Sequence, residues 1–339
     1  MSMEDCIFSI LSHRTLYRQE GIYCAFPGLA AGDDQLFLTF RITPAPNQRT
    51  HIDTRSGCLI CSFRGFDDSF ETCTVLKEDH YTGIQDPSIT YFGGIVYLSY
   101  FVYASLIGRH TKSRVKNGGV RVRWSSDGGL SWDDWGSIPG EVAASEPIIF
   151  VKGLPLLAVY QPYDYYEVSD LFYFDTKIIG DIATNPRGKF MSRIAGKPGL
   201  NFQEPALLSL GKQLLCIHRV YDSGVGHSVL LINRSNKDLS WTDPIPLWDG
   251  VSPNLCRLPD GRIILSYTHR VSKPYRVCAR VSEDEGLTWG DEIVLRETDG
   301  SWDIGYPSTV VWDGKLITAY YWQDKADKVR RIEGTRWEV

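Results

Sequence analysis

The chain has 339 residues, a formal net charge of −5, and 43% hydrophobic and 23% charged residues. This apolar share is enough for a large core, which excludes wholesale disorder, and an acidic chain without a Lys/Arg block is a poor partner for nucleic acid. Because no run of about 18 apolar residues is present, the sequence predicts no spanning helix and no membrane partner.

The N-terminus and the cysteines predict a cytoplasmic protein. Residues 1–6 are acidic where a secretory signal is basic, and the apolar stretch that follows is broken by Ser9. The eight cysteines lie mostly in apolar, strand-like runs, so we expect buried thiols rather than disulfides. Cys58 and Cys61 have a metal-like spacing, but no second pair lies nearby to complete a zinc site. We expect no metal and no cofactor.

Six segments along the chain share one pattern. In each, a residue followed by proline opens a short apolar run, a tight turn follows, and a second apolar run is rich in Tyr, Phe and Leu. The segments begin at Phe26-Pro27, Asp86-Pro87, Glu146-Pro147, Glu204-Pro205, Ser252-Pro253 and Tyr306-Pro307. Their prolines are 48 to 60 residues apart, which leaves room for four strands per repeat. The repeats predict an all-β fold, a six-bladed β-propeller of four-stranded antiparallel blades.

The last repeat is shorter than the others. After Tyr306 there is room for about three strands, whereas the stretch from Cys6 to Leu16 precedes the first repeat. We therefore expect the N-terminal stretch to supply the missing strand of the last blade, which closes the ring and leaves no open edge. Residues 1–339 would then form one domain.

A second element repeats with stricter chemistry. Residues 125–132 and 282–289 both fit Ser-x-Asp-x-Gly-x-x-Trp, and residues 235–241 are a degraded copy. These segments resemble the Asp boxes (BNR repeats) of the sialidase, or neuraminidase, superfamily. Ser and Asp side chains cap a tight hairpin, Gly accepts a positive φ, and Trp covers the turn. We expect structural turns on the outer rim.

The residue before each repeat proline is an equivalent position, and in a propeller such positions meet near the central axis. They include Asp86, Glu146, Glu204 and Tyr306. Carboxylates gathered at one place repel one another and raise one another's pKa, so a cation is required nearby.

Arginines at other repeat positions supply candidate cations. Arg41 and Arg219 each lie fourteen residues after a repeat proline, and Arg270 lies three places beyond that position in the fifth repeat. Arg276 enters the strand that leads to the second Asp box.

The resemblance to sialidases extends to these positions. It implies that Tyr306 is the nucleophile, that Glu204 is its base, and that Arg41, Arg219 and Arg276 hold the substrate's carboxylate. A neutral Tyr avoids the Coulomb repulsion that a carboxylate nucleophile would meet at a sugar acid. The expected activity is that of a retaining exo-glycosidase acting on a terminal sialic acid or related acidic carbohydrate, with Asp86 and Glu146 as further substrate contacts.

The first blade departs from the family pattern. Sialidases open it with Arg-Ile-Pro, whereas this chain has Ala25-Phe26-Pro27, and Arg41 is the candidate replacement. The family's acid/base Asp lies in the connection after the second strand, where this chain offers Asp53, with His51 as its rival.

Two other functions remain open on the same scaffold. His51 and Tyr306 suit a polysaccharide lyase that removes the C5 proton of a uronic acid. A non-catalytic glycan- or protein-binding propeller would instead use the tyrosines expected around the channel mouth, namely Tyr160, Tyr163, Tyr165, Tyr166 and Tyr321.

Overall fold

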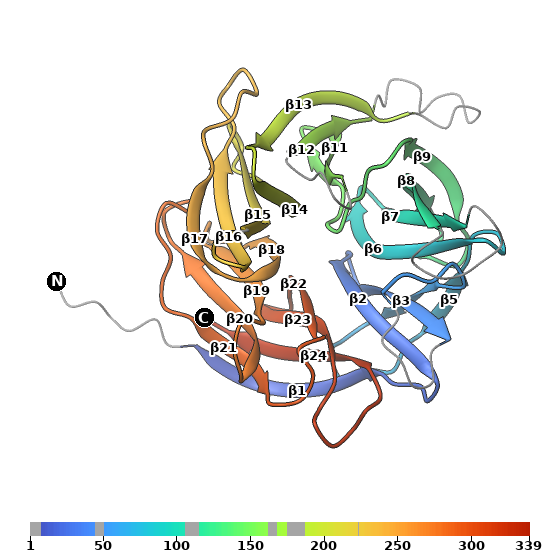
Figure 1. Ribbon diagram of the computed structural model, residues 1–339. Helices are drawn as coiled ribbons and strands as arrows, with labels where there is room; N and C mark the ends of the chain where they lie inside the picture. Colours follow the sequence, from blue (N-terminus) through green and yellow to red (C-terminus); the bar gives the residue numbers. More distant parts are fainter. Residues whose placement is uncertain (1–7, 45–50, 106–114, 162–167, 175–186, 223) are drawn as a thin grey trace.

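Six four-stranded antiparallel sheets surround a central axis in the computed structural model (Figure 1), as the repeats predict. The structure describes residues 8–44, 51–105, 115–161, 168–174, 187–222 and 224–339. This part of the chain contains no helix long and apolar enough to cross a membrane.

The first three blades follow one another along the chain. Blade I consists of β2 (Ile22–Ala31), β3 (Leu36–Pro44), β4 (Gly57–Phe63) and β5 (Thr72–Leu76). Blade II consists of β6 (Thr82–Phe92), β7 (Ile95–Ser105), β8 (Val115–Ser125) and β9 (Asp133–Ile138). Blade III consists of β10 (Ile149–Val151), β11 (Leu154–Tyr160), β12 (Val168–Tyr173) and β13 (Lys189–Gly196).

The last three blades complete the ring. Blade IV consists of β14 (Leu200–Ser209), β15 (Leu214–Asp222), β16 (His227–Arg234) and β17 (Ile245–Asp249). Blade V consists of β18 (Val251–Arg257), β19 (Ile263–His269), β20 (Tyr275–Ser282) and β21 (Ile293–Thr298). Blade VI consists of β22 (Gly305–Trp312), β23 (Lys315–Trp322), β24 (Arg331–Glu338) and, from the other end of the chain, β1 (Ser9–Tyr17).

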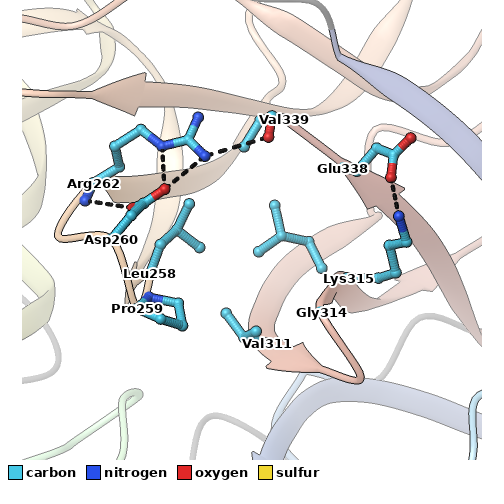
Figure 2. Close-up of a pocket in the computed structure, with 10 residues that line it drawn as sticks. Leu258, Pro259, Asp260, Arg262, Val311, Gly314, Lys315, Glu338 and Val339 are labelled. Carbon is cyan, nitrogen blue, oxygen red and sulfur yellow. Dashed lines mark hydrogen bonds and ion pairs between the residues drawn. The ribbon is translucent and has the colours of Figure 1, made fainter.

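In each blade, the turn between the first two strands lies at one face of the ring, which we call the turn face. The inner strands begin at the opposite face, which we call the channel mouth. Small cavities lie between neighbouring blades at the turn face. One of about 250 Å³ separates blades V and VI (Figure 2). Its charged side chains are paired, Arg262 with Asp260 at 2.8 Å and Lys315 with Glu338.

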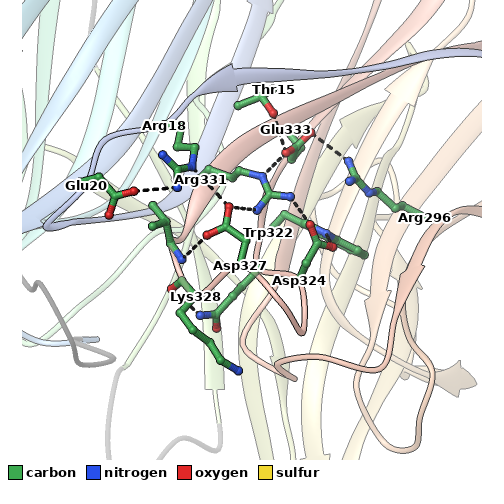
Figure 3. Close-up of polar contacts among 12 residues, drawn as sticks. Thr15, Arg18, Glu20, Arg296, Trp322, Asp324, Asp327, Lys328, Arg331 and Glu333 are labelled. Carbon is green, nitrogen blue, oxygen red and sulfur yellow. Dashed lines mark hydrogen bonds and ion pairs between the residues drawn. The ribbon is translucent and has the colours of Figure 1, made fainter.

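The N-terminal strand closes the ring, which confirms that prediction for the described residues. β1 pairs with β24, and Thr15 lies opposite Glu333. Figure 3 shows the polar contacts that reinforce this seam: the carboxylate of Glu333 accepts hydrogen bonds from Thr15 and Arg296, both at 2.9 Å, and from Arg331.

A bulge interrupts five of the six inner strands at the residue before the repeat proline. The strand register shifts there in β2, β6, β14, β18 and β22. The five residues have left-handed φ angles: Phe26 56°, Asp86 44°, Glu204 47°, Ser252 53° and Tyr306 50°. A non-glycine residue in this region costs on the order of 1 kcal/mol or more, and a bulge re-aims its side chain. In blade III the equivalent Glu146 precedes β10 instead.

The two intact Ser-x-Asp repeats form closed hairpin turns between the third and fourth strands of their blades. Ser125 donates to Asp127 at 2.7 Å and accepts from the Gly129 amide at 2.8 Å, and Ser282 makes the corresponding contacts with Asp284 and Gly286. Hydrogen bonds donated by the turn lower the pKa of Asp127 and of Asp284 to about 2. Both carboxylates are thus committed to holding the turn.

Candidate active site

Tyr306 and Glu204 meet between the inner strands of blades IV and VI. The Tyr306 hydroxyl donates to Oε1 of Glu204 at 2.5 Å, and Arg219 donates to the same oxygen at 2.7 Å. The other carboxylate oxygen accepts from the amide of Ser252 at 3.0 Å and from its hydroxyl at 3.1 Å. The bulges in β14 and β22 therefore aim two distant residues at one point.

The charges around this pair separate the two pKa values. Burial alone would raise the pKa of Glu204, but Arg219, the Tyr306 hydroxyl and Arg270 hold it below its ordinary range. Burial and the Glu204 carboxylate raise the pKa of Tyr306 well above 10. The site thus holds a neutral phenol hydrogen-bonded to an ionised carboxylate.

Arg270 is the second guanidinium beside Tyr306. Its central carbon lies 5.6 Å from the Tyr306 ring centroid, and it donates to the Tyr321 hydroxyl at 3.0 Å and to the carbonyl of Ile304. Arg270 follows directly after β19, and it lowers the pKa of Glu204 together with Arg219. Two arginines therefore flank the Tyr306–Glu204 pair.

Arg276, also expected at this point, forms an ion pair within blade V. It lies near the start of β20, and its guanidinium forms an ion pair with Glu292 at 3.4 Å. Burial, and then the charge of Arg276, lower the pKa of His269. Arg270, at the end of the preceding strand, is the blade V arginine for which the described residues show a contact with the Tyr306 ring.

Arg41 is fully buried in blade I. Its guanidinium lies 5.9 Å from the ring centroids of both Tyr23 and Phe26, and burial lowers its pKa. Its charge also acts on Asp86 and Asp53. Of the three arginines that the resemblance implies, Arg219 is the one for which the described residues show a contact with the Tyr306–Glu204 pair.

Asp53 is buried and tightly held by Arg55. Its carboxylate accepts two hydrogen bonds from the Arg55 guanidinium, at 2.9 and 2.5 Å, and one from the Arg55 amide at 2.8 Å. Burial would raise the pKa of Asp53, but these bonds outweigh it and keep the pKa below its ordinary range. Such a carboxylate is poorly suited to donate a proton near neutral pH.

His51 contacts a buried carboxylate that the sequence did not single out. Its Nε2 lies 2.8 Å from Oδ1 of Asp303, and its ring packs edge-on against Phe26, which itself contacts the ring of Tyr306. The His51 side chain is 31% exposed, so it retains access to solvent.

Asp303 is the centre of a polar network near the mouth. Tyr23 donates to it at 3.0 Å, Tyr321 at 2.9 Å, and Arg330 forms an ion pair at 2.9 Å. Burial opposes ionisation, but His51 and the nearby arginines hold the pKa of Asp303 well below its ordinary range. Asp303 lies in a connection outside the repeats, three residues before Tyr306, which is why the repeat pattern missed it.

Asp86 lies on β6 of blade II, and Glu146 precedes β10 of blade III. Asp86 accepts from Ser145 at 2.7 Å and from Gln85 at 3.0 Å, and Glu146 accepts from Asn254 at 2.8 Å. Burial raises the pKa of Asp86 to about 7 and that of Glu146 well above its ordinary value, and the charge of Glu204 adds to both shifts. These two groups convert from acceptors to donors when they bind a proton.

The tyrosines expected at the mouth are only partly described. Tyr160 and Tyr321 are buried, and the Tyr160 hydroxyl lies 3.1 Å from that of Ser145. Tyr163, Tyr165 and Tyr166 lie outside the described residues. Within the described ranges, no group of three or more His, Cys, Asp or Glu side chains is arranged to hold a metal ion.

The solved structures of similar architecture include a protein of unknown function and several sialidases. A protein of unknown function from Dyadobacter fermentans superposes with a TM-score of 0.79 at 22% identity, over 98% of this chain and 99% of its own. A Hadza microbial sialidase superposes with a TM-score of 0.65 at 15% identity, over 93% of this chain and 65% of its own. The chain has the fold of sialidases.

Two further sialidase structures agree with this fold. A leech intramolecular trans-sialidase gives a TM-score of 0.65 at 11% identity, over 96% of this chain and 70% of its own. Trypanosoma rangeli sialidase, in complex with the inhibitor DANA, gives 0.64 at 12% identity, and this chain spans 55% of its length. No protein-family model matches the chain, and no curated protein matches it in sequence.

Proposed function

We propose that this protein is a retaining exo-glycosidase that removes a terminal sialic acid or a related acidic sugar from a glycan. The 2.5 Å hydrogen bond from Tyr306 to Glu204 carries the proposal, because it joins a neutral nucleophile to a base that its arginines keep ionised. The sialidase fold supports it.

In this mechanism, Glu204 takes the phenol proton as the Tyr306 oxygen attacks the anomeric carbon. The bond to the leaving oxygen breaks, and a covalent sugar–Tyr306 intermediate forms. Water then attacks the same carbon and gives a proton to the acid/base group that protonated the leaving oxygen, and the phenolate recovers its proton from Glu204. Two displacements on one carbon retain its configuration. Arg219 and Arg270 bind the substrate's carboxylate by charge-assisted hydrogen bonds.

We assign the acid/base role to His51 rather than to Asp53. Asp53 is locked by Arg55 with a lowered pKa, whereas His51 is partly exposed and is oriented by Asp303. A carboxylate partner fixes an imidazole and stabilises its protonated form, as an acid that protonates a leaving oxygen requires.

A fluorogenic aryl sialoside tests the proposal. The wild type should hydrolyse it, and Tyr306→Phe should lose most of the activity because no oxygen remains to attack. Equal rates for the two proteins would remove Tyr306 from the chemistry.

Elimination is the second candidate, and one observation favours it. Phe26, not a guanidinium, occupies the blade I position at the channel, and its ring contacts both His51 and Tyr306. A neutral His51 would then remove the C5 proton of a uronic acid while Tyr306 protonates the departing oxygen at C4. The product is an unsaturated uronide, so a rise in ultraviolet absorbance without release of an intact acidic sugar would favour the lyase.

A further inference from the structure

A second cavity lies on the turn face, between blades III and IV, away from the channel mouth. Its volume is about 200 Å³. Ser209 and Leu214, which pair at the hairpin end of β14 and β15, line this cavity. Glu204 lies on β14 five residues before Ser209, nearer the channel mouth. At about 3.3 Å per residue, some 16 Å of strand separates Glu204 from this cavity.

Three lysines surround this cavity, each from a different hairpin turn. Lys152 comes from the β10–β11 turn, Lys212 from the β14–β15 turn and Lys237 from the β16–β17 connection. All three are exposed, and within the described ranges no ion pair joins any of them to a carboxylate. The cavity therefore concentrates positive charge in a protein whose net charge is negative.

The other walls of the cavity are mostly apolar. Leu154, Leu156, Met191, Leu214 and Leu239 line it, and Leu156 and Leu214 belong to the buried core of blades III and IV. Gln213 and Asn236 add amide groups to the lining. The cavity thus combines cations, an apolar surface and neutral hydrogen-bonding groups.

The cavity between blades V and VI in Figure 2 lies on the same face and provides a comparison. There Arg262 and Lys315 are each neutralised by a carboxylate, Asp260 or Glu338. The turns that open blades I and VI also carry acids, at Asp33, Asp34 and Asp313, whereas the blade II turn is Gly93-Gly94 and carries no charge. The lysines between blades III and IV, which have no ion pair in the described residues, therefore differ from the charged turns of blades I, V and VI.

We propose that this cavity is a second, non-catalytic binding site for one acidic sugar unit, carrying a carboxylate or a sulfate. The lysines would bind the anionic group, the leucines would contact an apolar face of the ring, and the amides would bind hydroxyl groups. The site uses none of the residues around Tyr306, so it stands independently of the proposed catalysis.

Calorimetric titration of the full chain with D-glucuronic acid tests the site, with D-glucose as the uncharged probe and inorganic sulfate as the bare anion. The triple variant Lys152→Gln/Lys212→Gln/Lys237→Gln removes the cations. Lys315→Gln is the control, because it removes a lysine from the paired cavity on the same face. All four substitutions are at exposed or half-buried side chains, and unchanged thermal unfolding would verify that the variants fold.

We expect glucuronic acid to bind the wild type and Lys315→Gln equally, and the triple variant at least about tenfold more weakly. Glucose should bind far more weakly than glucuronic acid, and added salt should weaken glucuronic acid binding. Unchanged affinity of the triple variant, or no binding to the wild type, would overturn the proposal. Sulfate bound as tightly as glucuronic acid would overturn the sugar assignment and leave an ion site.

Hydrolysis of the aryl sialoside by the triple variant separates this proposal from the proposed function. The variant should retain the wild-type rate while losing the second site. If no sialoside is hydrolysed by either protein, the glycosidase proposal fails while the binding result still decides the second site.

Discussion

Tyr306 donates its phenol hydrogen to Glu204 across 102 positions of sequence, at 2.5 Å. Both residues precede a proline, both have left-handed φ angles, and both sit at a bulge of an inner strand. The repeated strain in the fold is therefore what brings the proposed nucleophile and its base together.

Glu204→Gln should lower kcat by roughly 10²- to 10⁴-fold, because an amide cannot accept the phenol proton. Glu78→Gln is a matched control, since Glu78 accepts a hydrogen bond from Tyr100 at 2.5 Å and pairs with Arg121 within blade II. Steady-state kinetics on the sialoside should show the loss for Glu204→Gln alone. Equal losses in the two variants would indicate a structural role for both.

His51→Gln should reduce hydrolysis of a natural glycosidic linkage far more than that of an aryl sialoside, because a phenol leaves without protonation. Asp53→Asn should reduce both rates to a similar and smaller extent through its loss of the Arg55 contacts. The ratio of the two rates in each variant measures the effect. A linkage-selective loss in Asp53→Asn, and none in His51→Gln, would reverse the assignment.

Glu333→Ala should destabilise the ring closure by about 3 kcal/mol, because it leaves the buried Arg331 without one of its carboxylates and breaks the bond to Thr15. Glu338→Ala, at an exposed pair with Lys315, should cost about 0.5 kcal/mol or less. Chemical denaturation compares the two. A similar cost for both would show that the network in Figure 3 does not hold the seam.

Asp86→Asn should stabilise the fold at high pH. The folded pKa of Asp86 is about 7, above its unfolded value, so the folded state prefers the protonated acid. The wild type therefore loses stability as the pH rises from the unfolded pKa through about 7, and an amide escapes this loss. Thermal unfolding at pH 5 and pH 8 should show a larger gain for Asp86→Asn at pH 8. An equal gain in the unfolding temperature at pH 5 and pH 8 would contradict the raised pKa of Asp86.

Cys61 and Cys73 should form a disulfide under an added thiol oxidant such as diamide. They lie directly opposite each other on β4 and β5 with their sulfur atoms 2.7 Å apart, and Cys73 is exposed. Each thiol would lose a hydrogen as the S–S bond forms and diamide is reduced to its hydrazine. Mass spectrometry of non-reduced peptides should find the link in the wild type and not in Cys73→Ser, and a wild type with two free thiols would contradict the geometry.

The repeat pattern predicts the fold because each blade obeys the same backbone rules. The residue–proline pair marks the inner-strand bulge in five blades, and the unmatched N-terminal stretch is the strand that the last blade lacks. Glu146 departs because the inner strand of blade III is only Ile149–Val151.

The site is less predictable because much of it lies where the repeats differ. In blade V, Val251 pairs with Thr268, one residue later than the corresponding pairs in blades I, II, IV and VI, so a fixed spacing does not locate Arg270. Asp303 comes from the β21–β22 connection, outside the repeated segments. The sequence pattern also does not show which side chains pair with one another. Only the structure shows that Arg55 holds the carboxylate of Asp53.

The most direct test of the central claim is to trap the covalent intermediate. A 2,3-difluorinated sialic acid with a good leaving group slows hydrolysis of such an intermediate, and mass spectrometry of the intact and digested protein would locate the bound sugar. The account predicts one sugar attached at Tyr306 in the wild type and none in Tyr306→Phe. A sugar attached at another residue, or turnover of a sialoside without any adduct at Tyr306, would contradict it.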